Sequence, residues 1–168
     1  MESVKLLIDE MLKKTAKWLR IFGTDADFAS GRDDDALLLA AKEGGAVLVT
    51  KDEPLYSRCV KNGVRCFLVR SEDLAEQIAE IKTGLGLEFT FPEKTRCPAC
   101  NTPLEVVPRT EVSGRVEENV LKGFDKFWKC RGCGKVYWEG SHWVNITRIF
   151  ETAERIAAEK SAEGKAKG

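Results

Sequence analysis

Residues 33–52 read DDDALLLAAKEGGAVLVTKD. Three aspartates precede an apolar stretch of helical length, two glycines follow at 44 and 45, and a β-branched run then ends in Asp52. This order predicts an acid-capped helix, a turn at the glycines and a short buried strand over 47–50. The segment therefore indicates one α/β unit, with carboxylates at the start of its helix and at the end of its strand.

The same alternation of strands and helices extends over residues 4–83. Further strands are expected at 4–9, 25–29 and 64–69, and further helices from the end of the first strand to Phe22, at 54–62 and at 71–83 before Gly84. Four strands alternating with helices predict a parallel sheet with helices on both faces. Ligands of such sheets bind beyond the carboxyl ends of the strands, where the winding changes direction. If the first and third strands are neighbours, Asp9 and Asp52 both line that point.

These aspartates suggest a metal site. Clustered carboxylates raise one another's pKa and stay ionised together only with a cation between them. Mg²⁺ or Mn²⁺ prefers such hard oxygen ligands, and either ion can activate water against a phosphodiester. A second interpretation stays open, in which Asp33–Asp35 cap one helix and Asp52 caps the next, ahead of Pro54.

The six cysteines point to a second metal site. Two Cys-x-x-Cys pairs have the spacing of zinc ligands: Cys97, Cys100, Cys130 and Cys133. The 29 residues between the pairs predict a zinc ribbon with an elongated hairpin, and Asn101, Gly132 and Gly134 suit the knuckle turns. Four thiolates close the shell, so the zinc is expected to be structural. Redox pairs or disulfides are the alternative; Cys59 and Cys66 are expected to be small buried hydrophobes.

Basic and aromatic residues predict contact with nucleic acid. Lys13, Lys17 and Arg20 form a stripe on the first helix, which either holds phosphates or is its solvated face. The ribbon interleaves basic residues with aromatics, a combination suited to single-stranded RNA, while many of the aromatics also form its core. The single histidine, His142, is expected to lie against the ribbon, contact RNA or reach the acidic crevice.

The composition adds few constraints. The charges balance at 27 against 27, but residues 1–92 hold 13 basic and 16 acidic residues and residues 93–150 hold 10 and 7. No stretch is apolar and long enough to span a membrane, so a cytoplasmic protein is expected. The expected units are an α/β domain over 1–92, a zinc ribbon over 93–150 and a helical tail over 151–168 that frays near Ser161–Gly168.

Several motifs resemble one known family. They are LIDEML at 7–12, WLR at 18–20, DDALL at 34–38, LVTKD at 48–52, CPAC at 97–100 and YWEGSHW at 137–143. Together they resemble the PIN-like ribonuclease family of the Mut-seven C-terminal type, over roughly residues 4–148. The resemblance implies a shortened PIN-like parallel sheet followed by a zinc ribbon, and a metal-dependent ribonuclease acting on RNA.

By motif position, the resemblance implies that Asp9, Asp34 and Asp52 hold catalytic Mg²⁺ or Mn²⁺, with Asp35 able to replace Asp34. Larger PIN nucleases place an additional acid on a helix that this shorter segment does not match, which leaves one-ion and two-ion sites open. A protein partner or a homo-oligomer is compatible with the sequence.

Two other functions stay open. One is a non-catalytic RNA- or ribosome-binding protein, in which the ribbon binds and the acids only cap helices. The other is a phospho-receiver switch, although a receiver also needs a lysine at the end of a fifth strand, where this chain has entered the linker over 91–97.

Overall fold

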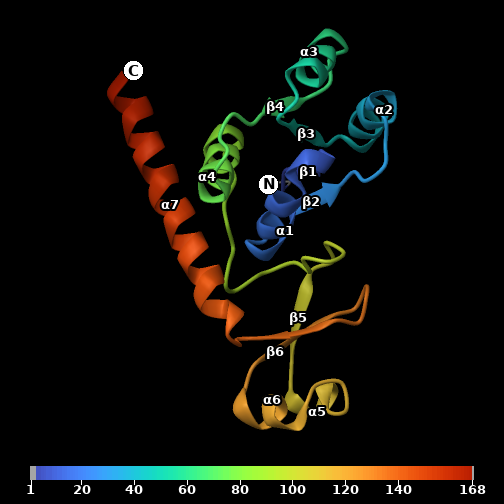
Figure 1. The fold of residues 1–168 in the computed structure, drawn as a ribbon, viewed down its shortest axis with the longest axis vertical. Helices are drawn as coiled ribbons and strands as arrows, with labels where there is room; N and C mark the ends of the chain where they lie inside the picture. The colour runs from blue at the N-terminus through green and yellow to red at the C-terminus, as the bar shows by residue number, and fades with distance from the viewer. Residues whose placement is uncertain (1–2, 168) are drawn as a thin grey trace.

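The structure is a computed structural model that describes residues 3–167 (Figure 1). In chain order its elements are β1 (Lys5–Ile8), η1 (Glu10–Leu12), α1 (Lys13–Ile21), β2 (Asp25–Phe28), α2 (Asp34–Gly44), β3 (Val47–Thr50), α3 (Glu53–Lys61), β4 (Cys66–Leu68), α4 (Leu74–Leu85), β5 (Leu104–Val107), α5 (Arg109–Val112), α6 (Glu118–Gly123), β6 (Phe127–Cys130), β7 (Val136–Trp138) and α7 (His142–Lys167). None of these helices is both long and apolar enough to cross a bilayer.

The first four strands form one parallel sheet in the order β2-β1-β3-β4. The chain leaves β2 at one edge and crosses over β1 to enter β3, so the winding changes direction between β1 and β3. The predicted α/β fold is confirmed, and so is the condition that the first and third strands are neighbours. The carboxyl ends of β1 and β3 therefore share the edge where ligands of such sheets bind.

Helices cover both faces of this sheet, as the alternation of side chains requires. Leu6 and Ile8 of β1 pack in a core cluster with α1 and α4, whereas Leu7 packs in a second cluster with α2 and α3. The β3 strand alternates in the same way, with Val49 in the first cluster and Leu48 in the second. Both strands are buried on both faces, which explains their nearly continuous apolar sequences.

The ends of the helices follow their glycines, with one difference from the expectation. Gly45 adopts a φ of 64° as the C-cap of α2, where the glycine pair predicted a turn. Helix α4, however, continues through Gly84 and ends at Leu85, with Gly86 as its left-handed cap. The prediction of a stop at Gly84 is wrong because this glycine serves packing: a Cβ there would lie 2.2 Å from the Phe67 ring.

The second sheet is the small antiparallel ribbon β5-β6-β7. Its elongated connection between β5 and β6 contains the short helices α5 and α6, which accounts for the long separation of the two cysteine pairs. A small core of its own holds it together, centred on Val107, Val112 and Phe127.

The ribbon docks at the amino end of the parallel sheet. The Asn101 side chain donates to Asp25 Oδ1 at 2.7 Å and accepts from the Ala26 N–H at 3.2 Å. The buried Arg20 guanidinium also joins the two parts, since it donates to the carbonyls of Ala26 at 2.7 Å and Pro98 at 3.0 Å. Because Asp25 begins β2, the ribbon contacts the end of the sheet opposite to the carboxyl edge.

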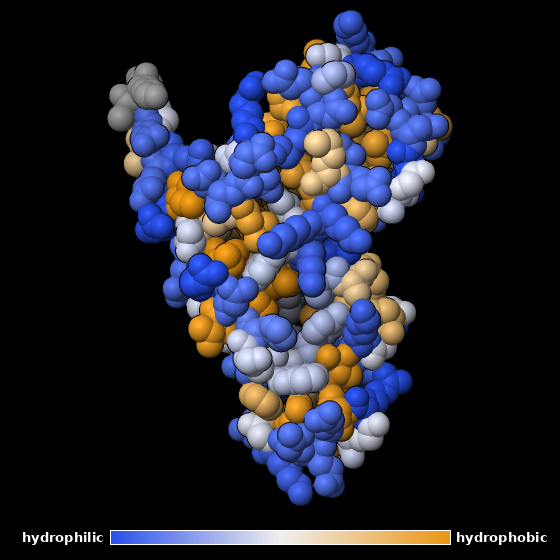
Figure 2. Space-filling model, viewed as in Figure 1, coloured by the Kyte–Doolittle hydropathy of each residue, from blue (hydrophilic) through white to orange (hydrophobic). Residues whose placement is uncertain are grey.

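Helix α7 returns from the ribbon to the first domain (Figure 1). It begins at His142, inside the segment expected to belong to the ribbon, and packs along α4 with Ala153 and Ala157 buried. Lys82 and Glu154 form an ion pair of 3.2 Å across this contact. The helix continues through the region expected to fray, as far as Lys167, and Gly168 lies outside the described residues. Figure 2 shows hydrophobic residues along the lower part of α7, and also over α2 and α3 and on the ribbon, among hydrophilic residues.

Candidate active site and metal centre

One hydroxyl links two of the predicted acids at the carboxyl edge of the sheet. Thr50, the fully buried last residue of β3, donates to Asp9 Oδ2 at 2.7 Å. The Thr50 hydroxyl oxygen in turn accepts a hydrogen bond from the N–H of Asp52 at 3.0 Å. Asp9 directly follows β1 and is 9% exposed. The structure thus brings the Asp9 carboxylate and the Asp52 backbone to the same point, where the winding reverses.

Both acids also cap helices, which the second interpretation of the sequence expected of Asp52 but did not assign to Asp9. Asp52 Oδ1 accepts from the Leu55 N–H at 3.0 Å as the N-cap of α3, and Asp9 Oδ1 accepts from the Glu10 N–H at 2.7 Å. A carboxylate has two oxygens and about four acceptor positions. Capping therefore leaves acceptor capacity on each carboxylate, and the two roles are compatible.

The third acid, Asp34, lies in the first turn of α2 and contacts Arg58. Asp33 is the N-cap of that helix, while Arg58 of α3 pairs with Asp34 at 3.4 Å and also with Asp35. The pKa of Arg58 is raised by its hydrogen bond to Asp35 and, to a smaller extent, by the charge of both acids. Within the part of the chain that the structure describes, Asp9, Asp34 and Asp52 do not bring three carboxylate oxygens within 4.8 Å of one another.

The basic residues and the histidine that were predicted to contact RNA do not lie together in the structure. Lys13 and Lys17 are exposed on α1, and Lys13 Nζ lies 5.9 Å from the centre of the Phe28 ring at the end of β2. Arg20 is 8% exposed, and its Nε and Nη1 donate to carbonyls inside the protein, so it is poorly placed to contact a phosphate. His142 is exposed at the start of α7, beside the ribbon and away from the carboxyl edge.

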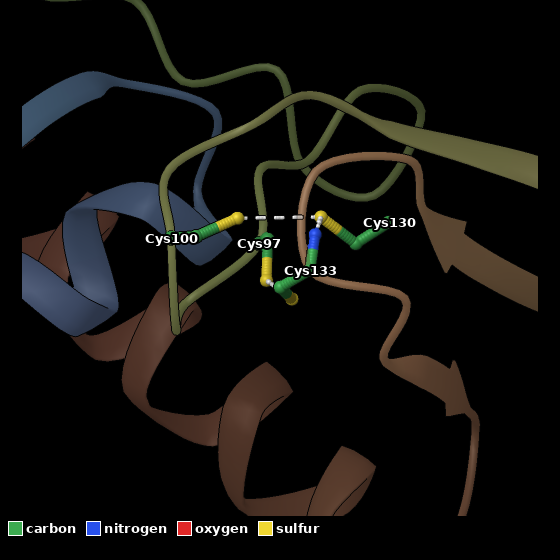
Figure 3. Close-up of side chains that lie close together, drawn as sticks. All are labelled: Cys97, Cys100, Cys130 and Cys133. Atoms are coloured by element: carbon green, nitrogen blue, oxygen red, sulfur yellow. Dashed lines mark hydrogen bonds between the residues drawn. The ribbon is translucent and has the colours of Figure 1, made fainter.

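The four predicted zinc ligands form one cluster (Figure 3). All four sulfurs lie within 4.8 Å of one another, with Cys97 and Cys133 at 3.7 Å and Cys100 and Cys130 at 3.3 Å. Among residues 3–167 this is the one group of three or more metal-ligating side chains so close together. A tetrahedral ion with bonds of about 2.3 Å separates its sulfur ligands by about 3.8 Å. The donor set and spacing therefore fit a metal such as zinc.

The knuckle turns use the residues expected of them, for two different reasons. Asn101 and Gly134 have φ values of 72° and 80°, the left-handed conformation that asparagine and glycine tolerate. Gly132 has no such φ, but a Cβ there would lie 2.4 Å from the Thr102 hydroxyl.

Different hydrogen-bond partners give two of the clustered thiols different pKa values. Side-chain and backbone hydrogen bonds between Cys100 and Thr102, together with smaller contributions from neighbouring cysteines, lower the pKa of Cys100 to about 6. A backbone hydrogen bond from Lys135 lowers the pKa of Cys133, but desolvation and the neighbouring thiols outweigh it and raise that pKa to about 11. Thiolates held this close repel one another, so a cation among them would relieve the repulsion.

The two remaining cysteines lie apart from this cluster, in the core between the sheet and α3. Cys59 is fully buried and Cys66 is half-buried. Burial, followed by the neighbouring Cys66 thiol, raises the pKa of Cys59 to about 11, which leaves it as an unreactive thiol at neutral pH.

Two residues of the candidate site were not singled out from the sequence. Thr50 carried a usable signal, because a hydroxyl in a fully buried strand needs a hydrogen-bond partner. Arg58 carried no local signal: it lies six residues after Asp52, and its partners belong to a different helix.

Comparison with known families gives one match. A model described as the Mut7-C RNAse domain matches residues 4–150, from β1 through the ribbon and into the first third of α7. No curated protein and no solved structure gives a significant match. The matched segment contains the acids of the carboxyl edge and all four clustered cysteines. The chain therefore belongs to the Mut7-C RNAse domain family, whose description indicates a ribonuclease.

Proposed function

We propose that this protein hydrolyses RNA phosphodiester bonds at the carboxyl edge of its parallel sheet, with Mg²⁺ or Mn²⁺ bound by Asp9, Asp34 and Asp52. The observation that carries the proposal is the Asp9–Thr50–Asp52 connection at the reversal between β1 and β3. Membership of the Mut7-C RNAse domain family supports a ribonuclease.

Each residue has a defined part in this proposal. Asp9 and Asp52 bind the cation from the ends of two neighbouring strands, and Thr50 keeps the Asp9 carboxylate facing the edge. Asp34 completes the ligand set from the start of α2 by turning away from Arg58, and its half-exposed side chain leaves room for that movement. Asp35 is the alternative, since Arg58 holds both. When bound, the ion supplies an activated water and stabilises the leaving oxygen.

Two exposed lysines are positioned to bind the phosphates of the RNA substrate. Lys13 follows shortly after Asp9 in the chain, and Lys17 lies about one turn further along the exposed face of α1. Cations placed there attract the phosphates that flank the bond to be cleaved.

We also propose that the four clustered cysteines hold a structural Zn²⁺. All four ligand positions are sulfurs from this chain, so no position remains for water or substrate. The ion would join the knuckle at Cys97 and Cys100, which docks on the first domain, to the knuckle at Cys130 and Cys133 between β6 and β7.

The Thr50→Val variant tests the connection between the two acids. Valine keeps the volume but leaves Asp9 Oδ2 and the Asp52 N–H without their partner, a loss worth about 1–3 kcal/mol. Because Asp9 is then less well oriented, we expect the Mn²⁺ concentration for half-maximal RNA cleavage to rise about tenfold. Thr24→Val, at a buried threonine before β2, is the matched control and should leave it unchanged. Equal metal requirements in both variants would contradict the role of Thr50.

The Arg58→Ala variant tests whether this arginine competes with the metal for Asp34. Removing one positive charge from two carboxylates should tighten Mn²⁺ binding by about two- to fivefold, the range of an exposed ion pair. The KM for RNA should rise, because a cation near the phosphates is lost. Arg155→Ala, which breaks an exposed ion pair on α7, should change neither value. Weaker Mn²⁺ binding in Arg58→Ala would show that the arginine orients Asp34 instead.

A further inference from the structure

One hollow of the structure lies on the ribbon, not beside the acids. It has a volume of about 620 Å³ and is bounded by β7, the turn before it and the segment that leads into α6. We call it the ribbon groove and define it by its lining residues: Arg115, Val116, Glu117, Val120, Gly134, Lys135, Val136 and Trp138.

The wall of the ribbon groove combines an aromatic ring, apolar side chains and cations. Trp138 is half-buried there beside three valines. Arg115 is held in place by a hydrogen bond of 2.9 Å from its Nη1 to the Gly134 carbonyl. Flat apolar surface beside fixed cations is the combination that stacks a base while pairing with its phosphate.

The cations of the groove are available, whereas others on the ribbon are engaged. Arg109, Lys129 and Arg131 each form ion pairs with ribbon carboxylates. Over residues 3–165, no carboxylate oxygen lies within 4.0 Å of the charged nitrogens of Arg115 or Lys135. The two cations face one lining carboxylate, Glu117, so the groove carries an excess of positive charge suited to a polyanion.

The position of the groove determines how much RNA is needed to reach it. The ribbon docks at the amino end of β2, and the acids lie at the opposite edge, beyond strands of four residues or about 13 Å. Figure 1 shows α6, which borders the ribbon groove, at the far end of the molecule from α2 and α3. A strand bound in the groove can reach the acids only if it runs along the protein.

We propose that the ribbon groove is a second binding site for single-stranded RNA, which holds a long substrate at a distance from the point of cleavage. This inference rests on the proposed function for its substrate class. Trp138 stacks a base, while Arg115 and Lys135 contact the phosphates beside it.

The test measures binding to the full chain without added Mg²⁺ or Mn²⁺, so that cleavage does not interfere. The probe is a fluorescent single-stranded RNA of about 16 nucleotides. In the double variant Arg115→Ala/Lys135→Ala we expect about tenfold weaker binding and a salt dependence of log K shallower by about 1.4, or two phosphate contacts. The control Lys42→Ala/Lys160→Ala removes two exposed charges from α2 and α7 and should leave both values unchanged. Equal weakening by the two double variants would overturn the proposal.

Substrate length separates this inference from the proposed function. With Mn²⁺ present, the Arg115→Ala/Lys135→Ala variant should cleave a tetranucleotide as the natural sequence does, but show a raised KM for the long RNA. Loss of the tetranucleotide reaction, unchanged binding of long RNA, or binding of a polyglutamate peptide in place of RNA would overturn the groove assignment. If instead Asp52→Asn cleaved RNA normally while groove binding remained as expected, the catalytic proposal would fail and the groove would stand.

The zinc content of the double variant reports whether it has folded. A second measurement tests the proposal even if it has not. Long RNA carrying 4-thiouridine is crosslinked by light to the protein of natural sequence, and the attached peptides are identified. We expect crosslinks within 115–120 and 134–138. Crosslinks confined to the sheet domain would overturn the proposal.

Discussion

The Asp52→Asn variant is expected to lose RNA cleavage by on the order of a thousandfold or more and to remain folded. Metal ligation by Asp52 supports both the activation of water and the stabilisation of the leaving oxygen, each worth several kcal/mol, and each 1.4 kcal/mol is a factor of ten in rate. Asparagine caps a helix about as well as aspartate, so the bond to the Leu55 N–H and helix α3 should persist. The measurement is Mn²⁺-dependent cleavage by purified protein, with thermal unfolding as the check on the fold.

The structure offers a matched control for this variant. Asp73 caps α4 in the same way that Asp52 caps α3, accepting a hydrogen bond from the Glu76 N–H at 3.1 Å. Asp73→Asn changes the same chemical group in the same local setting, but at a helix with no proposed metal ligand. It should keep full activity. If both variants were equally active, Asp52 would be only a cap, and an RNA-binding protein without catalysis would be the remaining interpretation.

The second large effect is expected at the cysteine cluster. Cys130→Ser removes a fully buried sulfur at the end of β6, and the zinc content should fall from about one ion per chain to nearly none. Structural zinc provides about 10–16 kcal/mol of apparent binding free energy to small domains. The ribbon core is small, so without the ion we expect β5-β6-β7 to unfold. Zinc analysis of the protein and the fluorescence of the ribbon tryptophans report the two changes.

The control for this variant is Cys66→Ser, a half-buried cysteine outside the cluster. It should keep its zinc and its tryptophan fluorescence. A Cys130→Ser protein that bound zinc at the same stoichiometry, or an ordered ribbon in protein stripped of zinc, would contradict the structural role.

Local patterns in the sequence were sufficient for the strands and most helix bounds of the first domain and for the cysteine ligand set. The aspartates before α2, the glycine pair after it and the β-branched run of β3 fix hydrogen bonds between residues only a few positions apart. Each Cys-x-x-Cys turn is likewise formed by residues close together in the sequence. The tertiary structure adds only the approach of the two turns to each other. Gly84 shows the limit of this reasoning, because its neighbour Phe67 is distant in sequence and changes a stop signal into a packing requirement.

By itself, then, the sequence determined the alternating strands and helices, the carboxylates at the strand ends and the two cysteine knuckles. Only the tertiary structure decided that β1 and β3 are neighbours, that Thr50 joins Asp9 to Asp52, and that the ribbon docks at the opposite end of the sheet. The physical reason is the range of the interactions. Strand order and docking depend on contacts such as that between Asn101 and Asp25, which lie 76 residues apart. Neither hydrophobic periodicity nor helix-capping residues in the sequence indicate which distant residues will form such contacts.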